Sequence, residues 1–191
     1  MTVVSNTSPI SYLVLIGEED LLPALYGHVL IPEAVRQELS HPEGPEPVRE
    51  WMLSSPSWIT TREGLSEARH PRSRRSGEGD LTRLDPGERD AILLAEREDA
   101  GLLLIDERAG RDAARNRGLT VTGTIGVLGA AVKKGHVDAV QVAKVLRDTT
   151  FRASPDLYAS CSTSRSRTEG LTWLPDSFHC EPVKLRFFLQ R

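Results

Sequence analysis

The chain is 191 residues long and has a formal net charge of −3, from 24 Lys and Arg residues and 27 Asp and Glu residues. This length accommodates one compact domain with a core of its own. The balanced charge excludes a protein that attracts nucleic acid through bulk electrostatics, so any such contact must be local. The two cysteines, Cys161 and Cys180, are too few for a disulfide framework or a zinc site.

No apolar run of about 20 residues occurs anywhere in the sequence, and no basic leader precedes an apolar stretch near Met1. We therefore expect a soluble, cytoplasmic protein that does not enter a membrane.

Short apolar runs alternate with helical patterns over the first 60 residues. The expected strands are Val3–Val4, Val29–Ile31 and an edge strand at Trp58–Thr60, and the expected helices are Ser8–Tyr26, Pro32–Ser40 and Val48–Leu53. Strands that alternate with helices in this way are typical of βαβ units, which predicts an α/β fold with a parallel sheet.

The stretch from Arg62 to Arg83 contains Arg69, Arg72, Arg74 and Arg75 among Ser, Gly and Pro, with few apolar residues. This composition favours a flexible basic insertion over a regular element. The insertion is either a solvated loop or an arm that steers nucleic acid. We favour the loop, because glycines and acids dilute its charge.

Regular patterns return after the insertion. The expected elements are helices at Pro86–Glu98, Arg108–Arg117, Ile125–Lys134 and Val137–Arg147, and strands at Leu102–Ile105 and Leu119–Val121. The tail from Cys161 has no clear period until an apolar run near its end. We therefore divide the chain into a domain over residues 1–150, with the insertion at 62–83, and an atypical, partly disordered tail over 151–191.

Polar residues follow two of the predicted strands. Ser5-Asn6-Thr7-Ser8 ends the first strand, and Asp106-Glu107 ends the strand at Leu102–Ile105. In an open parallel sheet, ligands bind in the crevice beyond the carboxyl ends of the strands. We expect both groups to face one crevice, and we prefer Asp106 to Glu107 as its acid because Asp106 stands directly at the strand end.

Two further acids are placed by helical angles of about 100° per residue. Glu38 borders the apolar face formed by Val35 and Leu39, whereas Glu33 and Gln37 point away from it. Glu88 shares the face of Ala91, Ile92 and Ala95, whereas Asp90 is expected to point toward water.

A buried carboxylate is costly unless it is paired, hydrogen-bonded or bound to a cation. Several such carboxylates near strand-end oxygens, without a His or Cys cluster, suit Mg²⁺ or Mn²⁺. The chemistry implied is phosphodiester hydrolysis with a metal-activated water, and Arg108 or Arg111 is a candidate contact to phosphate.

Each of these residues also has a purely structural interpretation. Asp85-Pro86-Gly87-Glu88 is a capping box with proline at the first helical position. Asp106 is a candidate cap for the helix that follows it, and Asn6 or Ser5 for the helix near Pro9. The functional interpretation therefore depends on the convergence of several acids.

Four segments together resemble the PIN-domain ribonucleases. They are Val3 to Ile10, which carries Asn6 followed by hydroxyl residues; Val29 to Leu39, which carries Glu38; Leu84 to Ile92, which carries Glu88; and Leu104 to Arg108, which carries Asp106. The order of the segments matches the family over roughly residues 2–150, and the first motif resembles an Asn-Thr-Ser subset of VapC-like toxins.

This resemblance implies a three-layer α/β/α Rossmann-like domain with a parallel sheet of four to five strands. It also implies a ribonuclease dependent on Mg²⁺ or Mn²⁺, with Glu38, Glu88 and Asp106 as catalytic residues and metal ligands and Asn6 as a weaker ligand. Thr7, Ser8, Arg108 and Arg111 are then substrate-binding or orienting residues. A homodimer and a protein antitoxin are the implied partners.

The sequence departs from the family pattern at Asn6, because the usual residue there is an aspartate. A neutral carbonyl oxygen binds a divalent ion more weakly than a carboxylate, so catalytic activity depends on whether Asn6 is tolerated. The family pattern also ends before the tail from Cys161.

Three hypotheses follow. The first is a metal-dependent endoribonuclease. It predicts metal-dependent cleavage of RNA that is lost in the variant Asp106→Asn. The second is a PIN-fold module that binds RNA or an antitoxin without cleaving, and that gains activity in Asn6→Asp. The third, a receiver-like or phosphatase domain, requires an aspartate nucleophile where Asn6 stands, and an amide cannot form an acyl phosphate.

Overall fold

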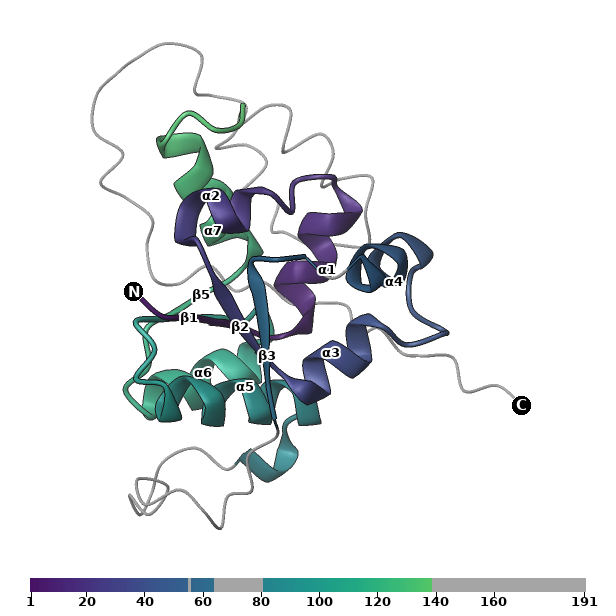
Figure 1. The fold of residues 1–191 in the computed structure, drawn as a ribbon. Helices are drawn as coiled ribbons and strands as arrows, with labels where there is room; N and C mark the ends of the chain where they lie inside the picture. The colour runs from purple at the N-terminus through teal and green to yellow at the C-terminus, as the bar shows by residue number, and fades with distance from the viewer. Residues whose placement is uncertain (55, 64–80, 139–191) are drawn as a thin grey trace.

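The computed structural model describes residues 1–54, 56–63 and 81–138, and these build a five-stranded parallel sheet between two helical layers (Figure 1). The strands are β1 (Val3–Ser5), β2 (Val29–Pro32), β3 (Ile59–Arg62), β4 (Leu102–Leu104) and β5 (Val121–Thr122). Their order in the sheet is β3-β2-β1-β4-β5. The chain therefore begins in the centre of the sheet, builds one half outward to β3 and then builds the other half outward to β5.

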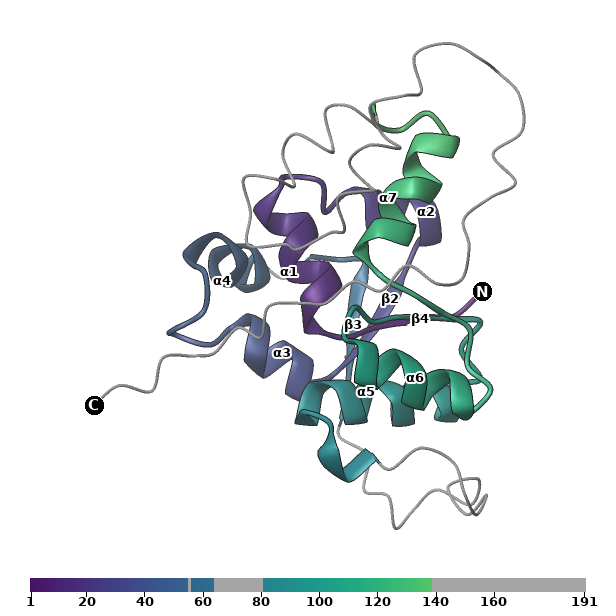
Figure 2. The same ribbon diagram turned by 180° about the vertical axis from the view of Figure 1, so that it is seen from behind.

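Seven α-helices and one 3₁₀ turn cover the described part of the sheet. They are α1 (Thr7–Leu15), α2 (Leu21–Tyr26), α3 (Glu33–Leu39), α4 (Glu46–Leu53), η3 (Leu81–Arg83), α5 (Pro86–Arg97), α6 (Arg108–Asn116) and α7 (Thr124–Lys133). Figure 2 shows α5 and α6 on the opposite side of the sheet from α1, α2 and α7. The predicted α/β/α architecture is confirmed.

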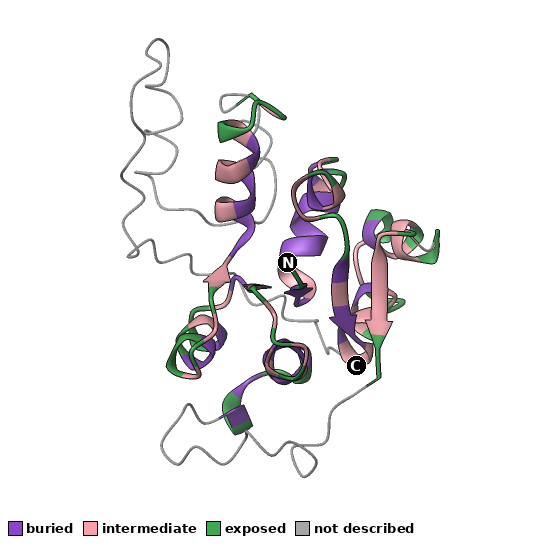
Figure 3. Ribbon diagram, turned by 60° about the vertical axis from the view of Figure 1, so that its left-hand side comes forward, coloured by how far each residue is buried: buried purple, intermediate pink, exposed green. Residues whose placement is uncertain are grey.

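Each helical layer has its own apolar core, because successive strand residues point to opposite faces of the sheet. Val3, Val29 and Leu104 belong to a first core cluster with α1, α2, α3, α4 and α7, whereas Val4 and Leu103 belong to a second core cluster with α5 and α6. Figure 3 shows the buried residues on the sheet-facing sides of the helices. Burial of these side chains stabilises the sheet from both sides.

The predicted helix Ser8–Tyr26 is wrong, because the structure has two helices there, α1 and α2. Gly17 has a φ of 71°, and the backbone N–H of Glu18 donates to the carbonyl of Leu13 at 2.8 Å. This pattern is a glycine C-cap, which ends a helix in the left-handed region that glycine adopts without strain. The chain turns there and returns along the sheet.

Other boundaries lie close to the expected ones. The edge strand near Trp58 is present as β3, and the strand expected at Leu119–Val121 starts at Val121. Most of the basic insertion, the expected helix Val137–Arg147 and the tail lie outside the described residues. No helix within the described ranges is long and apolar enough to cross a membrane.

Candidate functional site

The carboxyl ends of the neighbouring strands β1 and β4 lie side by side. Ser5 of β1 is in register with Leu104 of β4, and the backbone N–H of Asn6 donates to the carbonyl of Leu104 at 3.0 Å. Asn6 is 3% exposed, and its Oδ1 has no hydrogen-bond partner. A buried amide oxygen without a donor is uncommon in folded proteins and indicates a missing partner.

Glu38 reaches this point from α3. It accepts a hydrogen bond from Thr7 Oγ1 and another from the backbone N–H of Gly87, near the start of α5. Burial raises the pKa of Glu38, and the two hydrogen bonds partly oppose that rise. Glu38 therefore connects the first turn of α1 to the first turn of α5.

Asp90 differs from the sequence prediction, which placed it toward water. Its side chain is only 15% exposed, and its negative charge contributes to raising the pKa of Glu38. The helical angles of α5 reflect only its contact with the sheet, whereas α3 packs against another side of α5. Asp90 lies on that side.

Glu88 has the capping role that the sequence allowed, and only one of its two carboxylate oxygens takes part in it. Its Oε2 accepts a hydrogen bond from the backbone N–H of Asp85 at 3.4 Å, which closes the capping box of α5. Its Oε1 is buried without a hydrogen-bond partner. One carboxylate oxygen therefore caps the helix, and the other has no hydrogen-bond partner.

The environment of Glu88 strongly disfavours its charged form. Burial, and after it the negative charge of Glu107, raise the pKa of Glu88 from 4.5 to about 7; Asp85 and Glu38 add to the rise. A carboxylate held among other carboxylates in a buried position is stabilised when a cation neutralises it.

Asp106 lies in a different environment, where both of its oxygens are used. Its Oδ1 accepts the backbone N–H of Thr124 at 2.8 Å, and its Oδ2 accepts the hydroxyl of Thr124 at 2.7 Å. Asp106 is 1% exposed, and burial raises its pKa while Thr124 and Arg111 oppose the rise. It therefore caps α7, which starts 18 residues later, and not the helix that immediately follows it.

Each predicted acid lies against a glycine. A Cβ built on Gly87 would be 2.6 Å from Glu38 Oε1, one on Gly110 would be 2.8 Å from Glu88 Oε1, and one on Gly123 would collide with Asp106 Oδ1. A separation under 3.0 Å between a Cβ and an oxygen requires a shift of one of them. These three glycines make room for the carboxylates at the starts of α5, α6 and α7.

The residues expected to bind substrate differ in exposure. Thr7 and Ser8 are half-buried in the first turn of α1. The Arg108 side chain is 61% exposed, at 3.7 Å from Asp112. Arg111 is half-buried and extends toward Asp106, with its Nη1 3.5 Å from the carbonyl of Ile105. Arg108 is thus accessible to a large ligand, and Arg111 belongs to the interior of the site.

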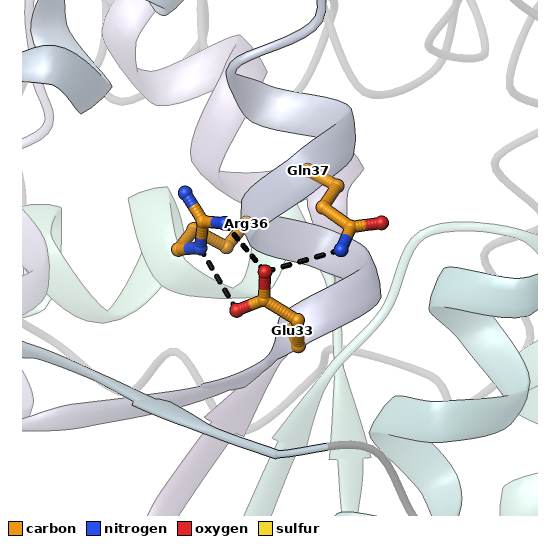
Figure 4. A network of polar contacts seen from close by, with 3 residues as sticks. All are labelled: Glu33, Arg36 and Gln37. Carbon is orange, nitrogen blue, oxygen red and sulfur yellow. Dashed lines mark hydrogen bonds and ion pairs between the residues drawn. The ribbon is translucent and has the colours of Figure 1, made fainter.

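Glu33 and Gln37 point away from the site, as predicted. Arg36 donates to Glu33 through Nε at 2.8 Å and through Nη2 at 2.5 Å, and Gln37 Nε2 donates at 3.1 Å (Figure 4). This network lies on the outer surface of α3. It leaves Glu38 as the acid that α3 directs toward α1 and α5.

The oxygens at the site suit a hard divalent cation by type. Within residues 1–54, 56–63 and 81–138, no group of three or more His, Cys, Asp or Glu side chains is placed to enclose a metal ion. Mg²⁺ does not need such an enclosure, because it retains several waters and binds through one or two carboxylates. The partnerless oxygens of Asn6 and Glu88 therefore fit an ion of this kind.

Several residues of the site were not identified from the sequence. Thr124, Gly87, Gly110 and Gly123 interact with acids that are distant along the chain, and those contacts exist only after the sheet has formed. The capping box at Asp85 was a usable local signal for Gly87. The remaining contacts had no comparable local signal.

Comparison with known proteins identifies the family of this chain. A family model described as a PIN domain matches residues 2–165. A PilT N-terminus domain protein from the hyperthermophilic archaeon Sulfolobus solfataricus P2 is similar in structure, with a TM-score of 0.47 and 15% identity over 70% of this chain and 95% of that chain. No curated protein matches.

Proposed function

The chain belongs to the PIN-domain family, and from this premise we propose that it is an endoribonuclease that hydrolyses RNA phosphodiester bonds with Mg²⁺ or Mn²⁺. PIN domains are typically nucleases and generally use divalent metal ions. The finer assignment to RNA follows from the resemblance of the four acid segments to PIN-domain ribonucleases.

One observation carries the proposal. Among the described residues, only three buried side-chain oxygens lack a hydrogen-bond partner, and two of them, Asn6 Oδ1 and Glu88 Oε1, belong to residues of the predicted site. Leaving a buried oxygen unsatisfied costs roughly 1–3 kcal/mol. A bound cation would accept both oxygens as ligands and so offset the free energy that their burial costs.

The residues of the site have different proposed roles. Asn6, Glu38, Glu88 and one acid of the adjacent pair Asp106 and Glu107 would supply oxygens to the metal, and Thr7 orients Glu38 through its hydroxyl. A bound divalent ion supplies a water of lowered pKa and neutralises charge on the phosphate. Arg108, exposed at the start of α6, would contact a phosphate of the RNA. Arg111 would place a positive charge beside Asp106.

A direct assay tests the nuclease proposal. Purified full-length chain is incubated with end-labelled single-stranded RNA in millimolar Mn²⁺, with EDTA and with DNA of the same sequence in parallel. We expect cleavage of RNA that EDTA abolishes and that Glu88→Gln loses. Glu33→Gln, which changes an acid on the outer surface of α3, is the matched control. Cleavage that persists in EDTA or in Glu88→Gln would contradict the proposal.

We further propose that the protein is the toxin of a type II toxin–antitoxin pair and forms a homodimer. This step rests on the VapC-like first motif around Asn6. Induced expression in a bacterial host should stop growth, and Glu88→Gln should not. Equal growth inhibition by both proteins would show that toxicity does not depend on the site.

The alternative function is a PIN-fold module that binds RNA or an antitoxin without cleaving it. The specific observation in its favour is Asn6, whose neutral oxygen replaces the usual carboxylate. This alternative predicts RNA binding by the wild-type chain without cleavage at millimolar Mn²⁺, and cleavage by Asn6→Asp. Cleavage by the wild-type chain excludes it.

A further inference from the structure

Asp106 and Glu107 are adjacent in sequence but face different helical layers. Along β4 and beyond it, Leu103 and Ile105 lie in the second core cluster with α5 and α6, whereas Leu104 lies in the first core cluster with α7. Continuing this alternation places Asp106 on the α7 side and Glu107 on the α5 side.

The contacts agree with the alternation. Asp106 binds the backbone and the hydroxyl of Thr124, the first residue of α7. The negative charge of Glu107, in contrast, raises the pKa of Glu88 on α5 more than the charge of any other residue does. Asn6 has the same parity, because Val4 of β1 belongs to the second core cluster and Asn6 lies two positions after it, with Ser5 between them. Asn6, Glu88 and Glu107 therefore share one side of the sheet.

The hydrogen bonds of Asp106 leave it little capacity for a metal. Thr124 donates its N–H to one oxygen of Asp106 and its hydroxyl to the other, which occupies one lone pair on each, and Gly123 lies close beside Oδ1. Arg111 adds a positive charge on the same side, which disfavours a second cation there. The group is satisfied without an ion.

We infer that Asp106 is a positioning residue, which fixes the start of α7 through Thr124, and that Glu107 is the acid that the end of β4 presents to Asn6 and Glu88. This inference rests on the proposed function for the role of Glu107. The role of Asp106 is independent of it, because the contacts with Thr124 require no metal.

The site test compares two isosteric changes. In Asp106→Asn, the amide oxygen still accepts the Thr124 N–H and the amide nitrogen can donate to the Thr124 hydroxyl, so only the charge is lost. Mn²⁺ affinity, measured on the full chain by titration calorimetry, should change less than about 3-fold. Glu107→Gln should weaken Mn²⁺ binding by about 10-fold or more, as expected for loss of an oxygen ligand or its immediate support. A larger loss in Asp106→Asn than in Glu107→Gln would overturn the inference.

The positioning role is tested in metal-free protein by thermal unfolding. Asp106→Ala and Thr124→Val should each lower Tm by roughly 4–10 °C. The double variant should lose much less than the sum, because both changes break the same contact. Thr124→Ser keeps the hydroxyl and the N–H, so its Tm should lie close to that of the wild-type chain. Additive losses would contradict the positioning role.

The two proposals fail differently. If the wild-type chain shows no calorimetric signal with Mn²⁺, the proposed function fails and Glu107 loses its assigned role, while the Asp106 and Thr124 unfolding data still decide the positioning role. If Mn²⁺ binds but Asp106→Asn abolishes binding, the proposed function survives and the inference is wrong.

Discussion

Glu88 and Asp106 are both buried acids at helix starts, yet their surroundings differ. Both Asp106 oxygens accept hydrogen bonds from Thr124, whereas Glu88 has one oxygen in a capping box and the other without a partner. A satisfied carboxylate stabilises the fold that holds it. A carboxylate that lacks a partner and lies beside other acids lowers the stability of the fold until a cation binds to it. The comparison therefore separates Asp106, which stabilises the fold, from Glu88, which we propose binds the metal.

The largest effect is expected from Glu88→Gln. The amide keeps an oxygen for the Asp85 N–H but loses the charge that would bind the metal. RNA cleavage should fall roughly 1,000-fold, equivalent to about 4 kcal/mol of transition-state stabilisation. Initial rates in Mn²⁺ measure this, with Glu33→Gln as the control that should retain wild-type rates. A loss below about 10-fold would place Glu88 outside the reaction.

The second effect is a pH dependence of stability in metal-free protein. The pKa of Glu88 is about 7 in the folded chain and near 4.5 without the fold. Between these pH values the folded state holds a proton that the unfolded state has released. The free energy of unfolding therefore falls as pH rises through this window, by roughly 3 kcal/mol for this group.

Urea unfolding from pH 4 to 8 checks this dependence. In Glu88→Gln the free energy of unfolding should fall less with pH, by about the contribution of Glu88. The raised pKa values of Glu38 and Asp106 lower the free energy of unfolding with rising pH in both proteins. Mn²⁺ should reduce the fall in the wild-type chain. Parallel pH curves for the wild-type chain and the variant would show that Glu88 ionises normally.

The third effect concerns the space around Glu88. Gly110→Ala would place a Cβ 2.8 Å from Glu88 Oε1 and 2.4 Å from Ile105 Cδ1. We expect destabilisation by roughly 2 kcal/mol, as for overpacked core positions, together with weaker Mn²⁺ binding. Ala109→Ser is the matched control, because it adds one heavy atom at the adjacent, exposed position of α6. Chemical unfolding of both variants measures the difference, and equal stabilities would contradict it.

The smallest effect is expected from Asn6→Asp. A carboxylate in place of the amide should tighten Mn²⁺ binding by about 10-fold, or roughly 1.4 kcal/mol, because the oxygen gains charge. Metal-free stability should fall, since the new charge joins Glu38 and Glu88 in a buried region. Calorimetric titration and thermal unfolding separate the two changes. Unchanged Mn²⁺ affinity would remove Asn6 from the site.

The sequence predicted the parts of the molecule that depend on local pattern. Strand and helix periods gave the α/β architecture and the orientation of Glu33, and the motif at Asp85 indicated the capping box. Long-range packing decided the rest. The Asp106 contact with Thr124 depends on the pairing of β4 with β5, and the low exposure of Asp90 depends on the packing of α3 against α5. A single sequence contains no direct signal for either arrangement.

A Mn²⁺-soaked crystal structure tests the central claim most directly, because the anomalous signal of Mn²⁺ locates the ion without an activity assay. We expect a peak within about 2–2.3 Å of Glu88 Oε1, on the side of the sheet that Asn6 and Glu107 share. The hydrogen bonds between Asp106 and Thr124 should be unchanged. A peak coordinated by Asp106 in place of Thr124, or no peak near Glu88 at millimolar Mn²⁺, would contradict it.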